Sequence, residues 1–135
     1  MDTKKLPRGI RNNNPLNIRK GNNWRGEIPN QTDGQFEQFS EMVYGLRAGI
    51  KLIKNYMTKY KANTIRKIVT RWAPNNENDT AAYIDFVSRD SGISPDTIIG
   101  FTEASKIVRI VSAMVQMENG QRLSDRLIIT AYYMV

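Results

Sequence analysis

Hydrophobic residues recur every three or four positions between Thr102 and Gly120, and this spacing predicts one long amphipathic helix. The stripe consists of Ala104, Ile107, Val108, Val111, Met114 and Val115. Its next position is Glu118, which is followed by the helix-stop signal Asn119-Gly120. Burial and the unpaired carbonyl groups of a last helical turn both favour a protonated carboxyl, the state that a general acid needs. The alternative is that Glu118 is a partly exposed surface residue without a catalytic role.

The remaining pattern predicts four more helices and one short β region. We expect these helices from the cap Ser40 to about Tyr60, from the cap Asn63 to Ala73, through Tyr83 to Gly92, and after the cap Ser124. Residues 21–39 have the composition of a β region, with Thr32-Asp33-Gly34 as a hairpin-type turn. The predicted fold class is therefore mainly α (α+β), a helical domain with a small β-hairpin region.

The length of 135 residues fits one domain, which we place at residues 8–135 after a flexible leader at residues 1–7. No segment approaches the roughly 18 consecutive apolar residues that a membrane span requires. The charged start, Met1 to Lys5, is not followed by an apolar run, so we expect no secretory signal. The protein would then be made in the cytoplasm and reach any other compartment by another route.

Cysteine and histidine are both absent, and this absence narrows the possible chemistry. It excludes Cys-His and Ser-His-Asp nucleophile systems, zinc sites built on thiolates or imidazoles, and disulfides. We expect no cofactor and no metal, so catalysis would rest on carboxylates, Tyr, Lys, Arg or amides. The net charge of +7 indicates an anionic partner, which could be nucleic acid, anionic lipid or an anionic cell-wall polymer. Nucleic acid ranks last because no helix interleaves basic and aromatic residues.

The segment from Arg8 to Arg19 is too rich in asparagine for a regular helix or strand. Asparagine side chains bond their own backbone and tolerate left-handed conformations, so Asn12-Asn13-Asn14 before Pro15 predicts a fixed turn. Such a turn also offers amide groups to sugar hydroxyl and acetamido groups. We take Asn13 and Asn14, with Trp24 and Tyr83, as candidate substrate contacts. Ordinary packing is the alternative for each of them.

Two motifs resemble those of small phage and prophage proteins, many of which are known only as virion structural proteins. They are Arg-Gly-Ile-Arg-Asn-Asn-Asn-Pro at residues 8–15, and Trp72 to Pro74 followed by Glu77 to Tyr83. This resemblance covers nearly the whole chain and implies membership of the lysozyme-like superfamily. A looser similarity is to flagellar-type and autolysin-type N-acetylglucosaminidases. The segments that carry it are Asn13 to Ile18, Trp24-Arg25-Gly26, Phe36 to Phe39 and Tyr44 to Tyr56.

The chain departs from lysozyme-like enzymes in the order of its elements. In those enzymes the catalytic glutamate ends a helix that precedes the asparagine turn, but here only Met1 to Pro7 precedes it. The stretch Ser112 to Gly120, near the other end, looks like that catalytic helix. We therefore expect a circularly permuted lysozyme-like domain, in which the last helices take the place of the usual first ones.

The resemblance implies cleavage of peptidoglycan glycan strands, of the muramidase, glucosaminidase or lytic transglycosylase type, as in phage endolysins. Glu118 would protonate the leaving oxygen. A second carboxylate would be Glu27 first, with Asp33 or Glu37 behind it and Glu77 as a further candidate. Alternatively, Glu118 acts alone, as in single-glutamate transglycosylases. The protein would act at the cell wall or periplasm after release, or within a virion beside other virion proteins. The competing hypothesis is a non-catalytic virion or cell-wall-binding structural protein of the same fold.

Overall fold

The computed structural model describes residues 6–75 and 79–135 and contains six α-helices in them. Most of the predicted leader and the candidate Glu77 lie outside the described residues. The helices are α1 (Arg8–Arg11), α2 (Met42–Tyr60), α3 (Ile65–Trp72), α4 (Thr80–Ser91), α5 (Ala104–Asn119) and α6 (Asp125–Tyr133). The prediction of a mainly α chain is confirmed.

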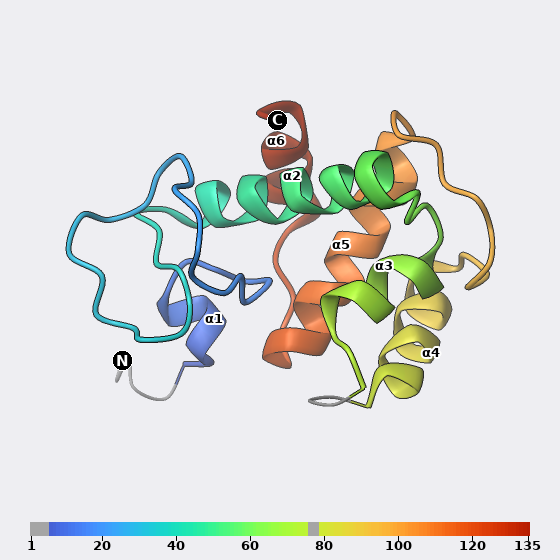
Figure 1. Cartoon of the computed structure of the whole chain (residues 1–135), viewed down its shortest axis with the longest axis horizontal. Coiled ribbons are helices and arrows are strands. Elements are labelled where there is room, and N and C mark those ends of the chain that lie inside the picture. The colour runs from blue at the N-terminus through green and yellow to red at the C-terminus, as the bar shows by residue number, and fades with distance from the viewer. Residues whose placement is uncertain (1–5, 76–78) are drawn as a thin grey trace.

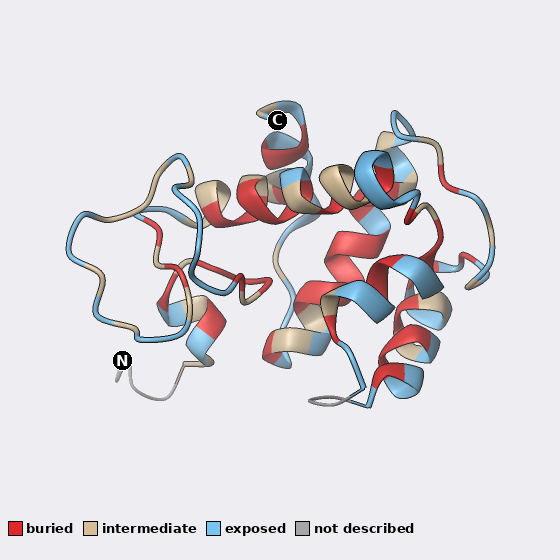
Figure 2. Ribbon diagram, in the orientation of Figure 1, coloured by how far each residue is buried: buried red, intermediate tan, exposed pale blue. Residues whose placement is uncertain are grey.

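The two halves of the molecule differ in regularity. The N-terminal half consists of α1 and long irregular loops, whereas α3 to α6 form the helical half, and α2 crosses from one to the other (Figure 1). Helix α5 packs against α4 and α6, and α2 packs against α6 and α3. Figure 2 shows that α5 is buried along most of its length, which makes it the central helix of the fold. The end of this central helix meets the N-terminal half, where α5 contacts α1.

The apolar stripe on α5 forms the centre of the main hydrophobic core. Ile107, Val111 and Val115 are buried there, as their helical spacing predicted. The main core also takes in buried side chains of α2, α3, α4 and α6. A second, smaller cluster lies under the N-terminal half and contains Ile18, Phe39 and Ala48, with Trp24 packed against it. The cores therefore anchor both halves to α2.

Helix ends agree with the sequence where a cap residue or glycine marks them. Ser124 accepts a hydrogen bond from the Leu127 amide at the start of α6, and Gly92 ends α4 with a φ of 74°. The prediction of Asn63 as a cap is wrong by one position, because Thr64 accepts from the Lys67 amide and begins α3. Helix α2 begins one residue later than expected, with Glu41 in place of Ser40 as its N-terminal flanking residue.

The predicted β-hairpin region is irregular in the structure. Within the described chain its backbone pairs only at two isolated antiparallel bridges, Arg19 with Phe36 and Glu27 with Phe39. Side-chain amides supply much of the remaining hydrogen bonding. Gln31 bonds the carbonyl groups of residues 28 and 38, and Gln38 accepts from the amides of residues 32 and 33. Such side-chain bonds satisfy backbone groups that a strand ladder would otherwise pair, which explains the absence of a regular hairpin.

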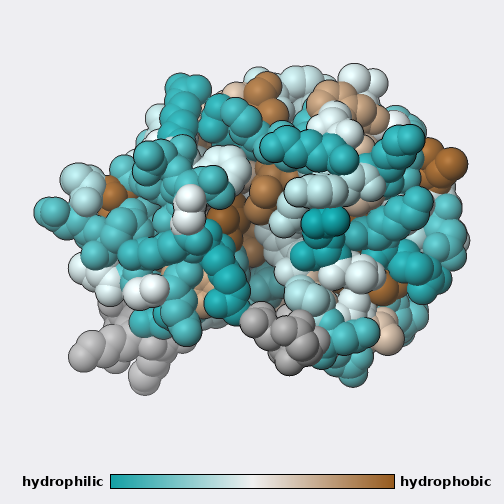
Figure 3. Space-filling model, viewed as in Figure 1, coloured by the Kyte–Doolittle hydropathy of each residue, from teal (hydrophilic) through white to brown (hydrophobic). Residues whose placement is uncertain are grey.

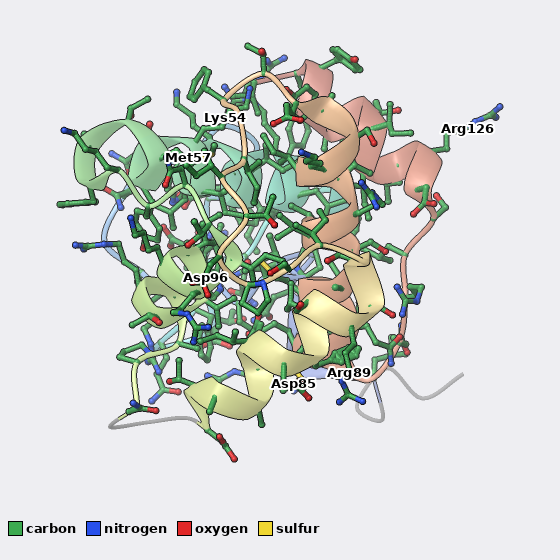
Figure 4. All side chains as sticks on the ribbon, turned by 90° about the vertical axis from the view of Figure 1, so that its right-hand side faces the viewer. Lys54, Met57, Asp85, Arg89, Asp96 and Arg126 are labelled. Atoms are coloured by element: carbon green, nitrogen blue, oxygen red, sulfur yellow. The ribbon has the colours of Figure 1, made fainter. Side chains whose placement is uncertain are left out.

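Charged residues are spread over the surface of the helical half. Asp85 and Arg89 form an ion pair of 2.8 Å on the outer face of α4, and Arg126 extends from α6 into solvent (Figure 4). Each helix of the described chain is too short or too polar to cross a bilayer. Basic residues without any acidic neighbour in the same helix lie on α2, which carries Arg47, Lys51, Lys54 and Lys59, and on α3, which carries Arg66, Lys67 and Arg71.

Candidate active site

Glu118 lies in the last turn of α5 and is held by two hydrogen bonds from distant parts of the chain. Asn17 Nδ2 donates to Oε1 over 2.8 Å, and the Tyr83 hydroxyl donates to Oε2 over 2.9 Å. Asn17 belongs to the asparagine turn and Tyr83 to α4, so the carboxyl joins three segments. The side chain is partly buried and does not project freely into solvent. The structure therefore brings Glu118 beside the asparagine turn.

Burial raises the pKa of Glu118 above the ordinary value of 4.5, although the hydrogen bonds from Asn17 and Tyr83 act in the opposite direction. Burial and the nearby Glu118 carboxyl both raise the pKa of Tyr83 well above 10.0, so this phenol stays a donor. At Glu118 the effect of desolvation on the pKa is therefore larger than the opposite effect of the two hydrogen bonds. A glutamate in this state keeps its proton to higher pH than a solvated one, as a general acid must.

The asparagine turn owes its shape to two left-handed residues. Asn13 and Asn17 have φ values of 53° and 52°, a region that asparagine tolerates better than most residues. Asn119, next to Glu118, donates to the Pro15 carbonyl over 2.7 Å. The turn is thereby attached directly to the end of α5. This attachment brings the Asn17 side chain close enough to donate directly to the Glu118 carboxyl.

A cleft of about 430 Å³ opens in front of Asn17. Its principal lining residues are Asn17, Ile18, Arg19, Tyr56, Arg71 and Trp72. Figure 3 shows this hollow between the two halves of the molecule, with hydrophobic atoms on its floor and polar atoms on its rims. Glu118 does not line the cleft; its carboxyl lies behind Asn17 and accepts a hydrogen bond from it. A ligand in the cleft would therefore meet the Asn17 amide before the carboxyl.

Aromatic and basic side chains from α2 and α3 form one wall of the cleft. Tyr56 and Trp72 pack edge to face with ring centroids 6.0 Å apart, and the Trp72 indole donates to the Leu16 carbonyl. The Arg71 guanidinium lies 3.5 Å from the ring centroid of Tyr60. Arg71 also lines a neighbouring hollow of about 560 Å³, so it lies between the two depressions. Rigid aromatic rings beside hydrogen-bonding groups can pack against the C–H face of a sugar ring while polar groups bond its hydroxyls.

Several residues predicted as substrate contacts have other functions in the structure. Asn14 is fully buried and uses its amide internally, donating to the carbonyl groups of Ile18 and Glu37 and accepting from the Ile18 amide. Full burial gives Asn14 a packing role in the turn, and its role as a substrate contact stays a prediction. Tyr83 is only 4% exposed, and its hydroxyl is bonded to Glu118. It positions the carboxyl rather than touching a substrate.

Asn13 and Trp24 also lie outside the lining of the cleft. The Asn13 amide donates to the Phe39 carbonyl over 3.1 Å, which fastens the turn to the start of α2. Trp24 packs against the smaller hydrophobic cluster, and its buried Nε1 has no hydrogen-bond partner among the described residues. Asn13 thus fastens the turn, Trp24 packs on the smaller cluster, and their role as substrate contacts stays a prediction.

Glu27, the predicted second carboxylate, lies beside Glu37. The two carboxyl groups are within hydrogen-bonding reach of each other, and burial together with this neighbour raises the pKa of Glu37 to about 7. They line a separate hollow of about 290 Å³, and Asn22 lines both this hollow and the main cleft. The hydrogen-bond partners of Glu118 are Asn17 and Tyr83, and neither is acidic. The pairing of Glu27 with Glu118 therefore stays a prediction.

The Asp33 carboxylate is fully used in structural hydrogen bonds. The Arg8 guanidinium donates two hydrogen bonds of 2.7 and 2.6 Å to this carboxylate. The backbone amides of Gln35 and Phe36 donate to it as well. These donors hold the pKa of Asp33 well below its usual range. A carboxylate so fully paired is a poor acid or base, which removes Asp33 from the candidates for a second catalytic carboxylate.

Asn17 is the principal residue that reasoning from sequence missed. It lies within the asparagine-rich motif, but only the three-dimensional path of the turn distinguishes it from Asn13 and Asn14. The cleft residues Tyr56 and Trp72 belong to segments that carried the family resemblances, but neither they nor Arg71 were predicted as site residues. Their signal in the sequence is the clustering of aromatic and basic residues at the ends of two consecutive helices.

Comparison with known proteins gives one informative relative. The chain is 42% identical over 117 residues to "Protein P5" of Pseudoalteromonas phage PM2, and the match covers 84% of this chain and 71% of that protein. No protein-family model matches the chain. The relative is a phage protein, and its name states no activity.

Proposed function

Because the chain belongs to the family of Protein P5 of Pseudoalteromonas phage PM2, we propose that it is a phage-type enzyme that cleaves peptidoglycan glycan strands. The observation that carries this proposal is the partly buried Glu118, whose pKa is raised and whose carboxyl accepts a hydrogen bond from Asn17, a residue that lines the cleft. The resemblance to lysozyme-like proteins supports the same reaction. The proposed fold is a circularly permuted lysozyme-like domain, with α5 in the place of the catalytic helix.

In the proposed reaction, protonated Glu118 donates its proton to the oxygen of the β-1,4 glycosidic bond. The bond between the anomeric carbon and that oxygen breaks, and the leaving sugar departs with a hydroxyl group. Each carboxyl oxygen has two lone-pair positions, so Glu118 can hold a proton while accepting from both Asn17 and Tyr83. Tyr83 and Asn17 then stabilise the carboxylate that remains after proton transfer.

Two routes complete the reaction. In a hydrolase, a carboxylate takes a proton from water as the water oxygen attacks the anomeric carbon, and the product has a reducing end. In a lytic transglycosylase, the Glu118 carboxylate takes the proton from the sugar's own C6 hydroxyl, which closes an anhydro ring. The neutral partners of Glu118 favour the single-glutamate route, whereas Glu27 would be the second carboxylate of the hydrolytic route.

The basic surface fits this substrate class. The net charge of +7 attracts an anionic wall polymer, and Arg71 sits on the cleft wall beside aromatic rings. Aromatic faces and amide groups bind sugar rings without requiring a metal or cofactor. The cleft thus supplies binding groups on one side and a proton donor behind Asn17.

A second candidate is a non-catalytic virion or wall-binding protein of the same shape. The observation that favours it is that both oxygens of Glu118 already accept hydrogen bonds that tie α4, α5 and the asparagine turn together. Under this hypothesis Glu118 is a structural link between the two halves.

Digestion of purified peptidoglycan with the wild type and Glu118→Gln, followed by mass spectrometry of the released fragments, separates these hypotheses. An enzyme gives fragments that Glu118→Gln abolishes, with reducing ends for a hydrolase and anhydro ends for a transglycosylase. Glu41→Gln is the matched control, because Glu41 is exposed and makes no capping bond. Intact glycan after incubation with the folded wild type would defeat the enzymatic proposal.

A further inference from the structure

A hollow of about 560 Å³ lies next to the cleft, and the proposed reaction does not use it. It is formed where the end of α2 meets α3 (Figure 1). Arg71 and Pro74 line both this hollow and the cleft, so the two are neighbours. Its volume falls within the range of roughly 300–1,000 Å³ that is typical of ligand sites. We call it the basic hollow, because the charged residues of its described lining are all cationic: Arg66, Lys67 and Arg71.

The positive charge of the basic hollow is only partly balanced. Both oxygens of Asp96 accept hydrogen bonds from Arg66, over 2.8 and 3.0 Å, and this pair balances one of the three cations. Asp96 also acts on Lys67 electrostatically, but without an ion pair between them. Lys67 and Arg71 are exposed and four residues apart on α3, so they share a face, where like charges repel. Neither forms an ion pair with a residue of the described chain, so an anion in the hollow would relieve their repulsion.

Arg71 is held in position by aromatic rings rather than by an acid. Its guanidinium carbon lies 3.5 Å from the ring centroid of Tyr60 and 5.7 Å from that of Tyr56. Such stacking uses the face of the planar group and leaves the N–H groups at its edge available. Within residues 6–75 and 79–135 these N–H groups have no hydrogen-bond acceptor. A stacked guanidinium with unused edge donors is suited to a carboxylate, because the two groups can form a bidentate pair.

The rings that hold Arg71 continue into the cleft. Tyr60 packs edge to face on Tyr56 with ring centroids 6.1 Å apart, and Tyr56 packs in the same way on Trp72 at 6.0 Å. Tyr60 is 53% exposed and lines the basic hollow, whereas Tyr56 and Trp72 line the cleft. A chain of rings thus leads from the cleft to the cationic groups. A ligand that extends from the cleft along these rings reaches Arg71 first and then Lys67.

We propose that the basic hollow binds carboxylate groups of the peptide side chains of peptidoglycan while the glycan strand occupies the cleft. This inference rests on the proposed function, because a glycan strand in the cleft carries its peptides into the neighbouring space. Arg71 would bind a carboxylate with its planar fork, and Lys67 would act as a point charge. Nucleic acid fits less well, since a duplex carries a charge about every 1.7 Å and needs a row of cations. The protein would then prefer strands that bear peptides over bare strands.

Titration of the isotope-labelled full chain with a sugar-free wall peptide, followed by NMR, tests the site apart from cleavage. The peptide should shift the signals of Lys67 and Arg71, and the same peptide with its carboxylates amidated should bind at least about tenfold more weakly. Lys67→Gln should weaken binding about two- to fivefold, as for an exposed ion pair, and Arg71→Gln about tenfold, because a bidentate pair is lost. Lys51→Gln is the matched control, since it removes an exposed positive charge from α2 outside the hollow and should bind as the wild type does.

Two results of the titration would overturn the proposal. Equal weakening by Lys51→Gln and Lys67→Gln, or equal binding of the charged and amidated peptides, would show attraction by net charge without a site. A DNA duplex that displaces the peptide at lower concentration, with an affinity that falls steeply as salt is added, would assign the hollow to nucleic acid instead.

Cleavage assays separate this inference from the proposed function. The wild type should cleave peptide-bearing strands faster than strands whose peptides an amidase has removed, and Lys67→Gln should lower that ratio of rates about two- to fivefold. Peptide binding without any cleavage would defeat the enzymatic proposal and leave the hollow as a site for the wall peptide. Equal cleavage of both substrates without peptide binding would leave the enzyme and overturn the inference.

Discussion

Asn17 and Glu118 are separated by 101 positions in the sequence, yet the Asn17 amide donates to the Glu118 carboxyl over 2.8 Å. This bond connects the asparagine turn of the irregular half with the end of the central helix. The neighbouring bond from Asn119 to the Pro15 carbonyl repeats the connection. Two hydrogen bonds thus hold the last turn of α5 beside the asparagine turn. The pH dependence of activity and of stability should reflect the hydrogen bond between Asn17 and Glu118.

Removal of the Asn17 side chain should raise the pKa of Glu118 further. The Asn17 bond favours the charged carboxylate, so Asn17→Ala leaves desolvation less opposed. In a peptidoglycan-cleavage assay the high-pH limit of activity, where the acid loses its proton, should move upward. The folded-state pKa of Glu118 lies above its unfolded value, so its contribution to stability decreases as pH rises above about 4.5. A pH–activity profile that shifts downward in Asn17→Ala would contradict this account.

Tyr83→Phe should destabilise the protein by about 1–3 kcal/mol, because Glu118 Oε2 loses its donor inside the protein. The ring of Tyr83 is 4% exposed, and Phe preserves its packing. Urea denaturation measures the change in the free energy of unfolding. A double-mutant cycle with Glu118→Gln isolates the hydrogen bond, since the two changes should be less than additive. Strict additivity would show that the hydroxyl stabilises the fold by other contacts.

The sequence was sufficient to predict the elements that depend on local pattern. The apolar spacing of α5 placed Glu118 at the end of a buried stripe, and Ser124 and Gly92 marked helix ends through their side-chain and backbone preferences. These features are properties of a few consecutive residues, and tertiary packing reinforces them. The same local signal was ambiguous between Asn63 and Thr64, because both residue types cap helices well.

The site depends on contacts that no local pattern encodes. Asn14 and Asn17 are the same residue type in one turn, but the first is fully buried in it and the second faces the carboxyl. Their difference arises from the left-handed conformation at Asn17 and from the packing of the turn against α2 and α5. Likewise, Glu27 and Glu37 looked like separate surface charges in the sequence. Only the fold of the irregular half brings them together.

Gly45→Ala should destabilise the protein although alanine normally favours a helix. A methyl group at position 45 of α2 would overlap the Asn13 carbonyl, and backbone cannot move aside as a side-chain tip does. The expected cost is about 1–3 kcal/mol, typical of overpacking in a close-packed interior. Gly34→Ala is the matched control, since nothing lies within 4 Å of the added carbon. Thermal unfolding compares the two, and equal melting temperatures would contradict close packing of the turn on α2.

Asp33→Asn should remove part of the protein's sensitivity to acid. Arg8 and two backbone amides hold the pKa of Asp33 well below its ordinary value of 3.8, so the folded state binds fewer protons than the unfolded chain in this range. The stabilisation is therefore fully present at neutral pH and is lost as pH falls below about 4. Urea midpoints at pH 7, 4 and 2.5 should decline less in Asp33→Asn than in wild type. Asp85→Asn, in an exposed pair within α4, should follow the wild type, since such pairs contribute little. Identical acid sensitivity of Asp33→Asn and wild type would show that the bond between Arg8 and Asp33 does not hold the N-terminal half together.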